Sequence, residues 1–310
     1  MGVKLSIMPK LPVRPAFRHE GNMPFSFLRI CAIVNYPAAS GILFHDSNGG
    51  TAMRYFIVDA FTDKMFHGNQ AGVCLVDRPL DDETMQKIAA ENNLSETAFV
   101  SPKGNDFDLR WFTPNTEIDL CGHATLASAF VVSGFTDAPP QVMRFHTLSG
   151  LLTVTKRGDL FEMDFPARKP VPTAVEPLFS QAFGVPVLEA HASRDLLLLV
   201  ENEDAVKALR PDFTLIRQIP GSFAVIVTAP GKEVDFVSRF FAPLAGIPED
   251  PVTGSSHSTL IPFWSERLNQ KEMVARQLSE RGGVLYCEDC GDRVKISGHA
   301  ALYLTGEIHV

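Results

Sequence analysis

The chain has 310 residues, which allows two domains of ordinary size, each with its own core. An apolar content of 45% and a charged content of 21% are typical of a soluble globular protein. The formal net charge of −8 argues against a broad nucleic-acid surface, because such a surface needs a basic face. No run approaches the roughly 20 apolar residues that span a bilayer. We therefore expect neither a nucleic-acid partner nor a membrane partner.

The cysteines say little about catalysis by themselves. There are five, too few and too scattered for a disulfide framework, and the odd number favours a reducing compartment, the cytoplasm. Cys287 and Cys290 form a Cys-x-x-Cys pair, but zinc would need two more ligands and no second pair exists. Because the pair lies between two strand-like runs, we interpret it as part of a hairpin turn. We expect no metal.

The first 52 residues differ from the rest. They are basic, contain few acidic residues and show no clean periodicity, a composition that also fits a targeting segment. The segment MRYFIVDAF, which begins at Met53, is typical of a first strand. We therefore predict that residues 1–52 are a poorly ordered, dispensable extension and that the first domain starts at Met53.

Strand-like and helix-like segments alternate after that point. The helix predicted over 81–93 has N-cap candidates at Asp81 and Asp82, and it places Met85, Ile88 and Ala89 on one face. A second helix, over 122–134, is rich in small residues and is expected to stop at Gly134. The other elements predicted in this half are a short apolar strand or helix at 68–77, strands at 53–61, 95–102 and 107–114, and a β meander over 143–166 with a turn at Gly158 and Asp159.

A proline-rich stretch, 166–177, is typical of a linker between domains. After it we predict helices at 176–184, 203–212 and 255–269, and strands at 194–201, 222–231, 235–243, 282–288, 293–298 and 299–310. The predicted fold class is α+β, with a first lobe over 53–166 and a second over 173–310. The last strand is free to return to the first lobe.

Two short segments in these halves resemble each other. DLCGHATLA (119–127) and EDPVTGSSHSTL (249–260) both combine an acidic residue, a glycine and small residues that open a helix. Helix N-termini bind anions, because their first N–H groups lack partners and the helix dipole is positive there. Two such ends facing a shared cleft would hold a small-molecule carboxylate substrate without a basic side chain.

Four polar residues lie at the ends of predicted elements and are candidates for chemistry. Each also has a plainer interpretation. Glu96 is otherwise a surface carboxylate, His123 a buried, hydrogen-bonded imidazole, Asp250 a turn residue before a proline, and Ser255 a helix N-cap. The two-lobed interpretation favours a functional role, because it points both glycine-containing turns at the same cleft.

The motifs together resemble those of the PhzF family, the phenazine biosynthesis-like isomerases and epimerases. The resemblance covers residues 53–310 and rests on VDAFTDKMFHGNQAGV, NLSETAFV, RWFTPNTEIDLCGHAT, FHTLSG, MDFPA, RFFAPLAGIPEDPVTGSSH and RVKISGHAALYLTGEI. It implies a diaminopimelate-epimerase fold, in which two pseudo-symmetric lobes each wrap a curved sheet around a central helix. It also implies a homodimer and a role in a biosynthetic process.

The resemblance implies an isomerase without a cofactor. In the phenazine pathway such an enzyme moves a hydrogen between two carbons of a dihydro-hydroxyanthranilate. The catalytic carboxylate of the family falls on Glu96, and its histidine, aspartate and serine fall on His123, Asp250 and Ser255. Their neighbours are expected to bind substrate: Ser95, Gly122 and Gly254.

Cys121 lies in the same turn as His123. In the related epimerases a cysteine stands at each of two equivalent turns, and the two thiols act as opposed bases. Here the second turn has Thr253 instead, so a two-thiol inversion is not expected and we interpret Cys121 as a small packing residue. Two alternatives stay open: an amino-acid epimerase or racemase with one carboxylate base, and a non-catalytic binding protein that keeps the fold.

Overall fold

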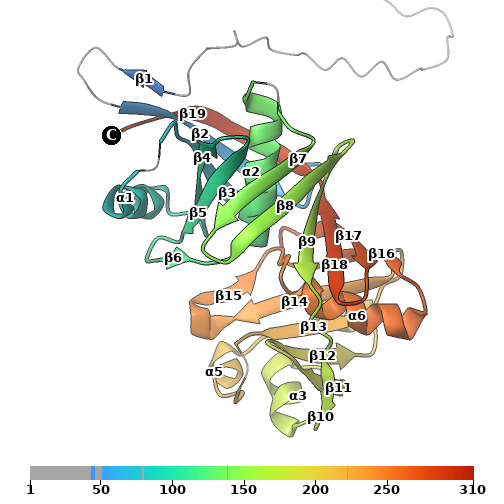
Figure 1. The fold of residues 1–310 in the computed structure, drawn as a ribbon. Helices are drawn as coiled ribbons and strands as arrows, with labels where there is room; N and C mark the ends of the chain where they lie inside the picture. The colour runs from blue at the N-terminus through green and yellow to red at the C-terminus, as the bar shows by residue number, and fades with distance from the viewer. Residues whose placement is uncertain (1–42, 46–50, 79, 138, 222) are drawn as a thin grey trace, which may run out of the picture. The chain divides into compact units, whose positions relative to one another are not determined.

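The computed structural model describes residues 43–45, 51–78, 80–137, 139–221 and 223–310, and these belong to one compact unit, Ala39–Val310 (Figure 1). The remainder of the predicted extension lies outside the described residues. The first long strand, β2 (Thr51–Ala60), begins two residues before Met53. It pairs antiparallel with β1 (Leu43–His45).

The first lobe contains the elements that were predicted from the periodicity. α1 has Asp81 as its N-cap and buries Met85, Ile88 and Ala89, as expected. The ambiguous 68–77 segment is a strand, and the helix predicted to stop at Gly134 runs one residue further. In chain order the lobe consists of β2, β3 (Asn69–Leu75), α1 (Asp82–Asn92), β4 (Thr97–Lys103), β5 (Asp106–Phe112), β6 (Glu117–Ile118), α2 (Gly122–Phe135), β7 (Val142–Thr147), β8 (Gly150–Arg157) and β9 (Leu160–Pro166).

The second lobe has the predicted helices and strands and several elements that were not predicted. Its elements are β10 (Val171–Thr173), α3 (Pro177–Phe183), β11 (Val187–Ala192), β12 (Leu196–Val200), α4 (Glu203–Lys207), α5 (Phe213–Ile216), β13 (Val225–Pro230), β14 (Phe236–Ala242), the 3₁₀ turn η1 (Pro243–Ala245), β15 (Ile247–Asp250), α6 (His257–Leu268), β16 (Glu272–Gln277), β17 (Gly283–Asp289), β18 (Arg293–Gly298) and β19 (Ala300–His309). Cys287 lies near the end of β17, and Cys290 lies in the turn between β17 and β18. The two strands pair as a hairpin, so the hairpin interpretation is confirmed.

The two lobes repeat the same order of strand pairings. From β2 through β5 and β7 to β9, successive pairs are antiparallel, parallel, antiparallel, parallel, antiparallel and antiparallel. From β11 through β14 and β16 to β18 the order is identical. The short strands β6 and β15 pair with the fourth strand of their own lobe. The expected pseudo-symmetric α+β fold is therefore present.

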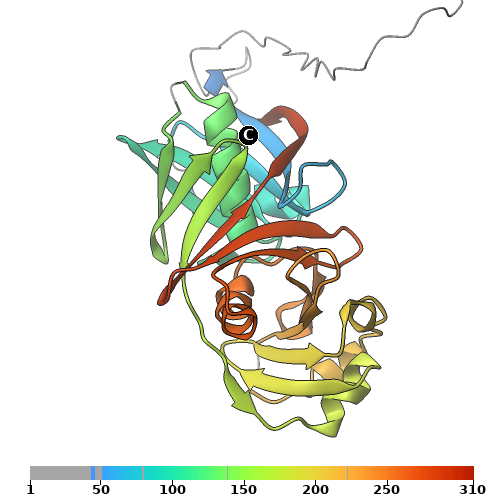
Figure 2. The ribbon, with the colours of Figure 1, turned by 90° about the vertical axis from the view of Figure 1, so that its right-hand side faces the viewer.

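Three further pairings complete the sheets, and two of them join the halves of the chain. The last strands of the two repeats, β9 and β18, pair antiparallel with each other. The C-terminal strand β19 returns to pair with β2, as Figures 1 and 2 show at the two ends of the colour scale. β10, which lies inside the proline-rich stretch, pairs with β11. The strand that follows the first set of repeated pairings, β10, thus joins the second lobe, and the strand that follows the second set, β19, joins the first lobe.

A central helix fills each lobe. α2 packs against β2, β3, β4 and β9, and most of its residues are buried, which suits a helix wrapped by a sheet. α6 packs against β16, β17 and β18 and buries His257 through Ser265. None of the helices among the described residues is both long enough and apolar enough to cross a bilayer. The sheets therefore hold both helix N-termini in fixed places, and the candidate residues lie there.

Candidate active site

Glu96 is placed by the end of α1 and the start of β4. Helix α1 ends at Asn93, which adopts a left-handed conformation with φ 49°. The chain then turns, and the Glu96 carbonyl oxygen accepts a hydrogen bond from the Gly72 N–H at 3.0 Å. The side chain is buried, with 6% of the residue exposed. Glu96 is therefore not the surface carboxylate of the plainer interpretation.

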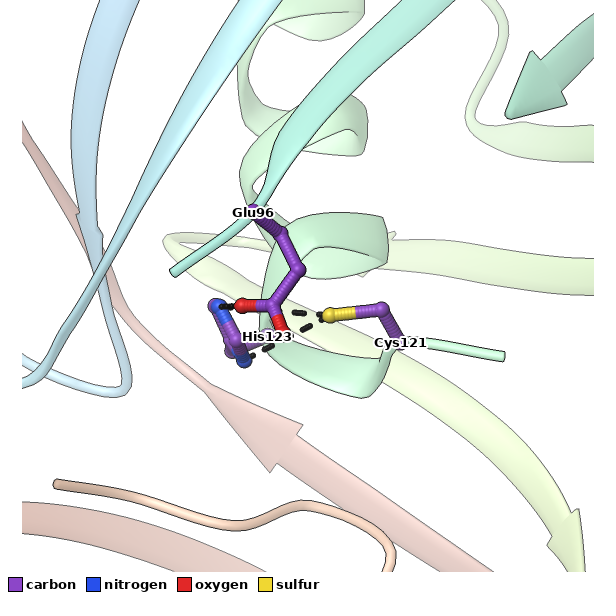
Figure 3. Close-up of side chains that lie close together, drawn as sticks. All are labelled: Glu96, Cys121 and His123. Carbon is purple, nitrogen blue, oxygen red and sulfur yellow. Dashed lines mark hydrogen bonds and ion pairs between the residues drawn. The ribbon is translucent and has the colours of Figure 1, made fainter. Parts of the chain in front are cut away.

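His123 is the second residue of α2, and Cys121 is the N-cap of the same helix. Both are buried, and the Cys121 side chain makes no capping hydrogen bond. Figure 3 shows that the side chains of Glu96, Cys121 and His123 point toward one another. The Cys121 Sγ atom lies 3.6 Å from Nδ1 of His123 and 3.9 Å from Nε2. One turn of sequence thus brings a thiol and an imidazole against a buried carboxyl group.

The closest polar contact of Glu96 is with His123. Oε2 of Glu96 lies 2.9 Å from Nε2 of His123, within ion-pair distance, and this contact helps to raise the pKa of the ring. The contact is not a well-aligned hydrogen bond, and buried Oε2 has no other polar partner among the described residues. A carboxylate oxygen can accept more than one hydrogen, so Oε2 keeps the capacity to accept a substrate proton beside the imidazole.

The neighbours of His123 determine which ring nitrogen holds the proton. Burial raises the pKa of the Cys121 thiol, so the sulfur is uncharged at neutral pH and presents S–H. Burial lowers the pKa of His123, whereas Cys121 and Glu96 raise it above the ordinary histidine value when both are ionised. Nε2 faces the Glu96 carboxylate at 2.9 Å, whereas Nδ1 faces the neutral thiol at 3.6 Å and, at 3.2 Å, the Asn69 amide, whose two hydrogens are shared with Asp250 and Val252. The ring proton is therefore assigned to Nε2, where it points at the acceptor oxygen of Glu96.

Asp250, the last residue of β15, is linked to His123 through Asn69. Nδ2 of Asn69 donates to Oδ1 of Asp250 at 2.7 Å and to the Val252 carbonyl oxygen at 2.9 Å. The other carboxyl oxygen of Asp250 accepts from the Thr253 hydroxyl at 2.5 Å. Burial raises the pKa of Asp250 to about 6, against the His123 ring and the Thr253 hydrogen bond, which lower it. Asp250 is thus a structural partner of the site with both oxygens engaged.

Asn69 is a functional residue that the sequence interpretation missed. It begins β3, directly after Gly68, which has φ 67°. A Cβ atom at Gly68 would lie 2.2 Å from the Ala60 carbonyl oxygen, so only glycine fits there. The signal available in the sequence was a Gly-Asn pair next to a strand, which by itself predicts no more than a turn.

The two glycines expected to bind substrate face each other. A Cβ atom built on Gly122 would lie 3.5 Å from Cα of Gly254 and 4.0 Å from the Ser255 nitrogen. The starts of α2 and α6 therefore lie side by side, as the repeated motif predicted. α6 itself begins at His257, because its first hydrogen bonds form a tighter turn from the carbonyls of Gly254 and Ser255.

The two candidate serines are in different situations. Ser255 lies in the turn before α6 and is partly buried, and its Oγ accepts a hydrogen bond from Nη2 of Arg194 at 3.2 Å. It makes no N-cap hydrogen bond, because the N-cap position is Ser256. Ser95 is exposed, and among the described residues its side chain has no hydrogen-bond partner. The structure thus brings Glu96, His123 and Asp250 into one network, with Ser255 beside it, and leaves Ser95 outside.

A metal ion is the other ligand to consider for this cluster. The ligand atoms of Glu96, Cys121 and His123 all lie within 4.8 Å of one another. A zinc ion would sit about 2.0–2.3 Å from each ligand and would need a thiolate. Because burial raises the pKa of Cys121, metal binding would first have to remove a proton from a neutral thiol. The donor set therefore fits a resident metal poorly.

Comparisons with known proteins show which family the chain belongs to. Residues 58–306 match the family model of phenazine biosynthesis-like proteins. A protein of Pseudomonas aeruginosa, named an uncharacterized isomerase, is 49% identical over 255 residues, which are 82% of this chain and 98% of the relative. A second one from the same organism, with the same name, is 48% identical over 259 residues, covering 83% of this chain and 99% of the relative.

Solved structures of the same family also resemble this chain. A PhzF-family protein of Enterococcus faecalis has 45% sequence identity and a TM-score of 0.83, over 84% of this chain and all of the other. A hydroxyproline epimerase of Agrobacterium vitis, at 12% identity and a TM-score of 0.55, shares the fold alone. The chain therefore belongs to the family of phenazine biosynthesis-like proteins, the PhzF family, and the two Pseudomonas aeruginosa relatives are named isomerases.

Proposed function

We propose that the protein is a cofactor-independent isomerase that moves a proton between two carbon atoms of a small carboxylated molecule. The observation that supports this most is the Glu96 carboxylate, which is buried and has the His123 imidazole, 2.9 Å away, as the one polar partner of Oε2 among the described residues. General acid–base catalysis needs a base whose lone pair is free at the reacting carbon. The proposal assigns this role to Oε2.

The proposed reaction balances without an added reactant. A substrate C–H bond breaks, its proton forms an O–H bond on Glu96, and the electron pair moves into the conjugated system of the substrate. The Glu96 O–H bond then breaks as the proton returns to a second carbon on the same face. The Nε2–H of His123 stabilises negative charge that develops on the substrate meanwhile. A prearranged acid and base in one dry site lower the cost of orientation.

The substrate carboxylate is proposed to bind beside the neighbouring starts of α2 and α6. Gly122 and Gly254 pack against each other there, so the anion would lie next to the pair, and the unpaired N–H groups at a helix N-terminus favour an anion. Asn69 and Asp250 hold His123 from behind, so that the substrate meets a fixed ring. The proposal needs neither a metal nor an organic cofactor.

An epimerase would require a second acid or base on the opposite face of the substrate. The position equivalent to Cys121 is Thr253, whose hydroxyl is occupied with Asp250. Asp250 is the other buried carboxyl of the network, and both its oxygens already accept hydrogen bonds. The geometry therefore favours one base, Glu96, and the isomerase over the epimerase.

The test is proton exchange with solvent deuterium. Small conjugated carboxylic acids are incubated with the protein in D₂O, before and after dialysis against a chelator, and products are identified by NMR and mass spectrometry. We expect a positional isomer, with or without the chelator treatment. It carries deuterium at the new C–H in those turnovers in which the proton held on Glu96 exchanges with D₂O before it returns. Glu96→Gln, which keeps the shape of the side chain, is the control and should form the isomer far more slowly.

Other outcomes would contradict the proposal. A product that differs only by inverted configuration would support the epimerase. Acids that raise the melting temperature without any exchange would support a binding protein. Activity that disappears on chelation and returns with a metal would show that the cluster of Glu96, Cys121 and His123 holds a required ion.

A further inference from the structure

Arg194 lies at the edge of the proposed site, in the turn between β11 and β12. Its Nε and Nη2 atoms donate to the two carboxyl oxygens of Asp195 at 2.9 and 2.7 Å, and Asp195 is fully buried. Nη2 also donates to Oγ of Ser255 at 3.2 Å. The paired carboxylate fixes the plane of the guanidinium group, so Arg194 is held beside the turn that precedes α6.

Arg168 lies close to the turn that carries Arg194: its carbonyl oxygen accepts a hydrogen bond from the hydroxyl of Ser193 at 3.4 Å. Its backbone N–H donates to the Ser258 carbonyl oxygen at 2.8 Å, in the first turn of α6. Its Nη1 atom is buried and has no hydrogen-bond partner among the described residues, and none of their carboxylates forms an ion pair with it. Burial and the charge of Arg194 lower the pKa of Arg168, and Asp195 raises it.

The two arginines leave one positive charge uncompensated. Asp195 is the carboxylate within electrostatic reach of both, so it balances one of two cations. The start of α6, a helix of 12 residues, adds a positive dipole end at the same place. In a chain of net charge −8, carboxylates are plentiful, yet none of the described ones pairs with Arg168. A partly buried, unpaired guanidinium destabilises the unliganded fold, which is expected of a group kept for a ligand.

We propose that Arg168 and Arg194 form a second anion subsite beside Ser255, which binds an oxyanion group, a carboxylate or a phosphate, of the substrate. Arginine suits this role because its planar donors match carboxylate and phosphate oxygens two at a time. This inference rests on the proposed function, in which a first carboxylate of the substrate binds beside Gly122 and Gly254. The two subsites together select a small molecule with two anionic groups.

Binding is measured without turnover, so that the result does not depend on the proposed reaction. Calorimetric titrations use inorganic phosphate and succinate with the wild-type protein, Arg168→Gln and Arg194→Lys. The control is Arg157→Gln, because Arg157 is an exposed residue that pairs with Glu162 on the surface. We expect at least one anion to bind the wild type and the control equally, and to bind both site variants roughly 10-fold or more weakly.

The stability of the unliganded protein separates a ligand-binding arginine from a structural one. Because Arg168 has no partner to lose, Arg168→Gln should leave the melting temperature unchanged or raise it, while it abolishes the stabilisation by added anion. The anion that stabilises more, phosphate or the dicarboxylate, identifies the group. The inference is wrong if Arg168→Gln binds both anions as the wild type does, or if neither anion binds the wild type. Either result would leave the proposed role of Glu96 in proton exchange standing. Conversely, a protein that showed no proton exchange could still bind anions at Arg168 and Arg194.

Discussion

Asp250 is the carboxyl group of the site that titrates near neutral pH. Its pKa is raised to about 6 by burial, and its ionised form accepts hydrogen bonds from Asn69 and Thr253. Protonation would remove a negative charge that helps to hold Asn69, and through it His123, in place. We therefore expect kcat/KM to fall as the pH is lowered through about 6, in a pH profile measured with a substrate that does not titrate there.

Thr253→Val tests whether the fall in kcat/KM on the acidic side of the pH profile, its acidic limb, is caused by protonation of Asp250. The Thr253 hydroxyl donates to Asp250 and lowers its pKa, so the variant should raise the pKa further and move the limb to higher pH. Thr116→Val removes an exposed hydroxyl that donates to the Glu117 carbonyl oxygen and not to Asp250, so it should leave the profile in place. A limb that stays where it was in Thr253→Val would assign the titration to another group.

Asn69 is expected to act as a positioning residue. Asn69→Ala removes one amide that contacts His123, Asp250 and the Val252 carbonyl oxygen. We predict a fall in kcat of roughly 10-fold or more with a smaller change in KM, because the ring that meets the transition state is no longer held. Asn92→Ala, which loses a hydrogen bond to Thr97 only, is the matched control. Equal effects of the two variants on kcat would remove Asn69 from the site.

The difference between predicted and unpredicted site residues is one of distance along the chain. Glu96, His123, Asp250 and Ser255 became candidates because each stands at the end of a predicted element, in a short motif that the family resemblance covers. Asn69 contacts partners 54 and 181 residues away, and Arg194 reaches a residue 61 positions away. Periodicity and turn chemistry describe neighbours in sequence, so such contacts become visible only when the sheets are assembled.

At the scale of single elements, α2 and α6 begin at corresponding places in the two repeats. The sequence could predict this because glycine and small residues before an apolar run are typical of a helix start. It could not predict that α6 begins at His257, because the tight turn before it is held by tertiary contacts. One of them is the hydrogen bond from the Thr253 N–H to Oε1 of Gln277 on β16, at 2.9 Å.

His257 couples the start of α6 to pH. It is fully buried, Nδ1 lies 2.8 Å from the Thr253 carbonyl oxygen, and burial lowers its pKa to about 4. The unfolded chain binds the proton near pH 6.5, so the stability that this residue provides is present above 6.5 and is lost as the pH falls toward 4. The loss amounts to about 3 kcal/mol over that window. We expect urea denaturation of His257→Asn to show a shallower decline than the wild type.

Comparing the two proteins cancels the opposite effect of Asp250, whose raised pKa favours the folded state at low pH and loses that contribution as the pH rises through about 6. His309→Asn serves as the control, since this histidine is exposed near the C-terminus. If the wild type and His257→Asn lose stability in parallel between pH 6.5 and 4, the imidazole is not the group that titrates.

At the scale of the whole molecule, every site residue lies within the unit Ala39–Val310. We predict that deletion of residues 1–38 leaves the melting temperature and the exchange rate nearly unchanged. A deletion of residues 1–52 should cost more, because it also removes β1 and the first two residues of β2, which pair with each other and, at Ala52, with β19. Scanning calorimetry of both truncations checks this. A loss of several degrees on deleting 1–38 would show that this segment stabilises the body.

The pairing of the lobes shows where prediction from the sequence stops. Alternation of strands and helices predicted two α+β lobes, and the repeat of pairing order confirms that they are alike. The exchange of β10 and β19, and the joining of β9 to β18, depend on which strand edges remain open once the lobes form. A short strand such as β10, in a proline-rich segment, has no pattern of its own that predicts pairing.

The central claim is that Glu96, and not Cys121, is the base. Its most direct test compares the rates of deuterium incorporation into substrate by Glu96→Gln and Cys121→Ala, with folding of both checked by circular dichroism. We predict that Glu96→Gln loses about 10²–10⁴-fold of the exchange rate. Cys121→Ala should stay close to the wild type, because its thiol is neutral and has no thiol counterpart at Thr253. Exchange that survives in Glu96→Gln and disappears in Cys121→Ala would contradict the account and make the thiol the base.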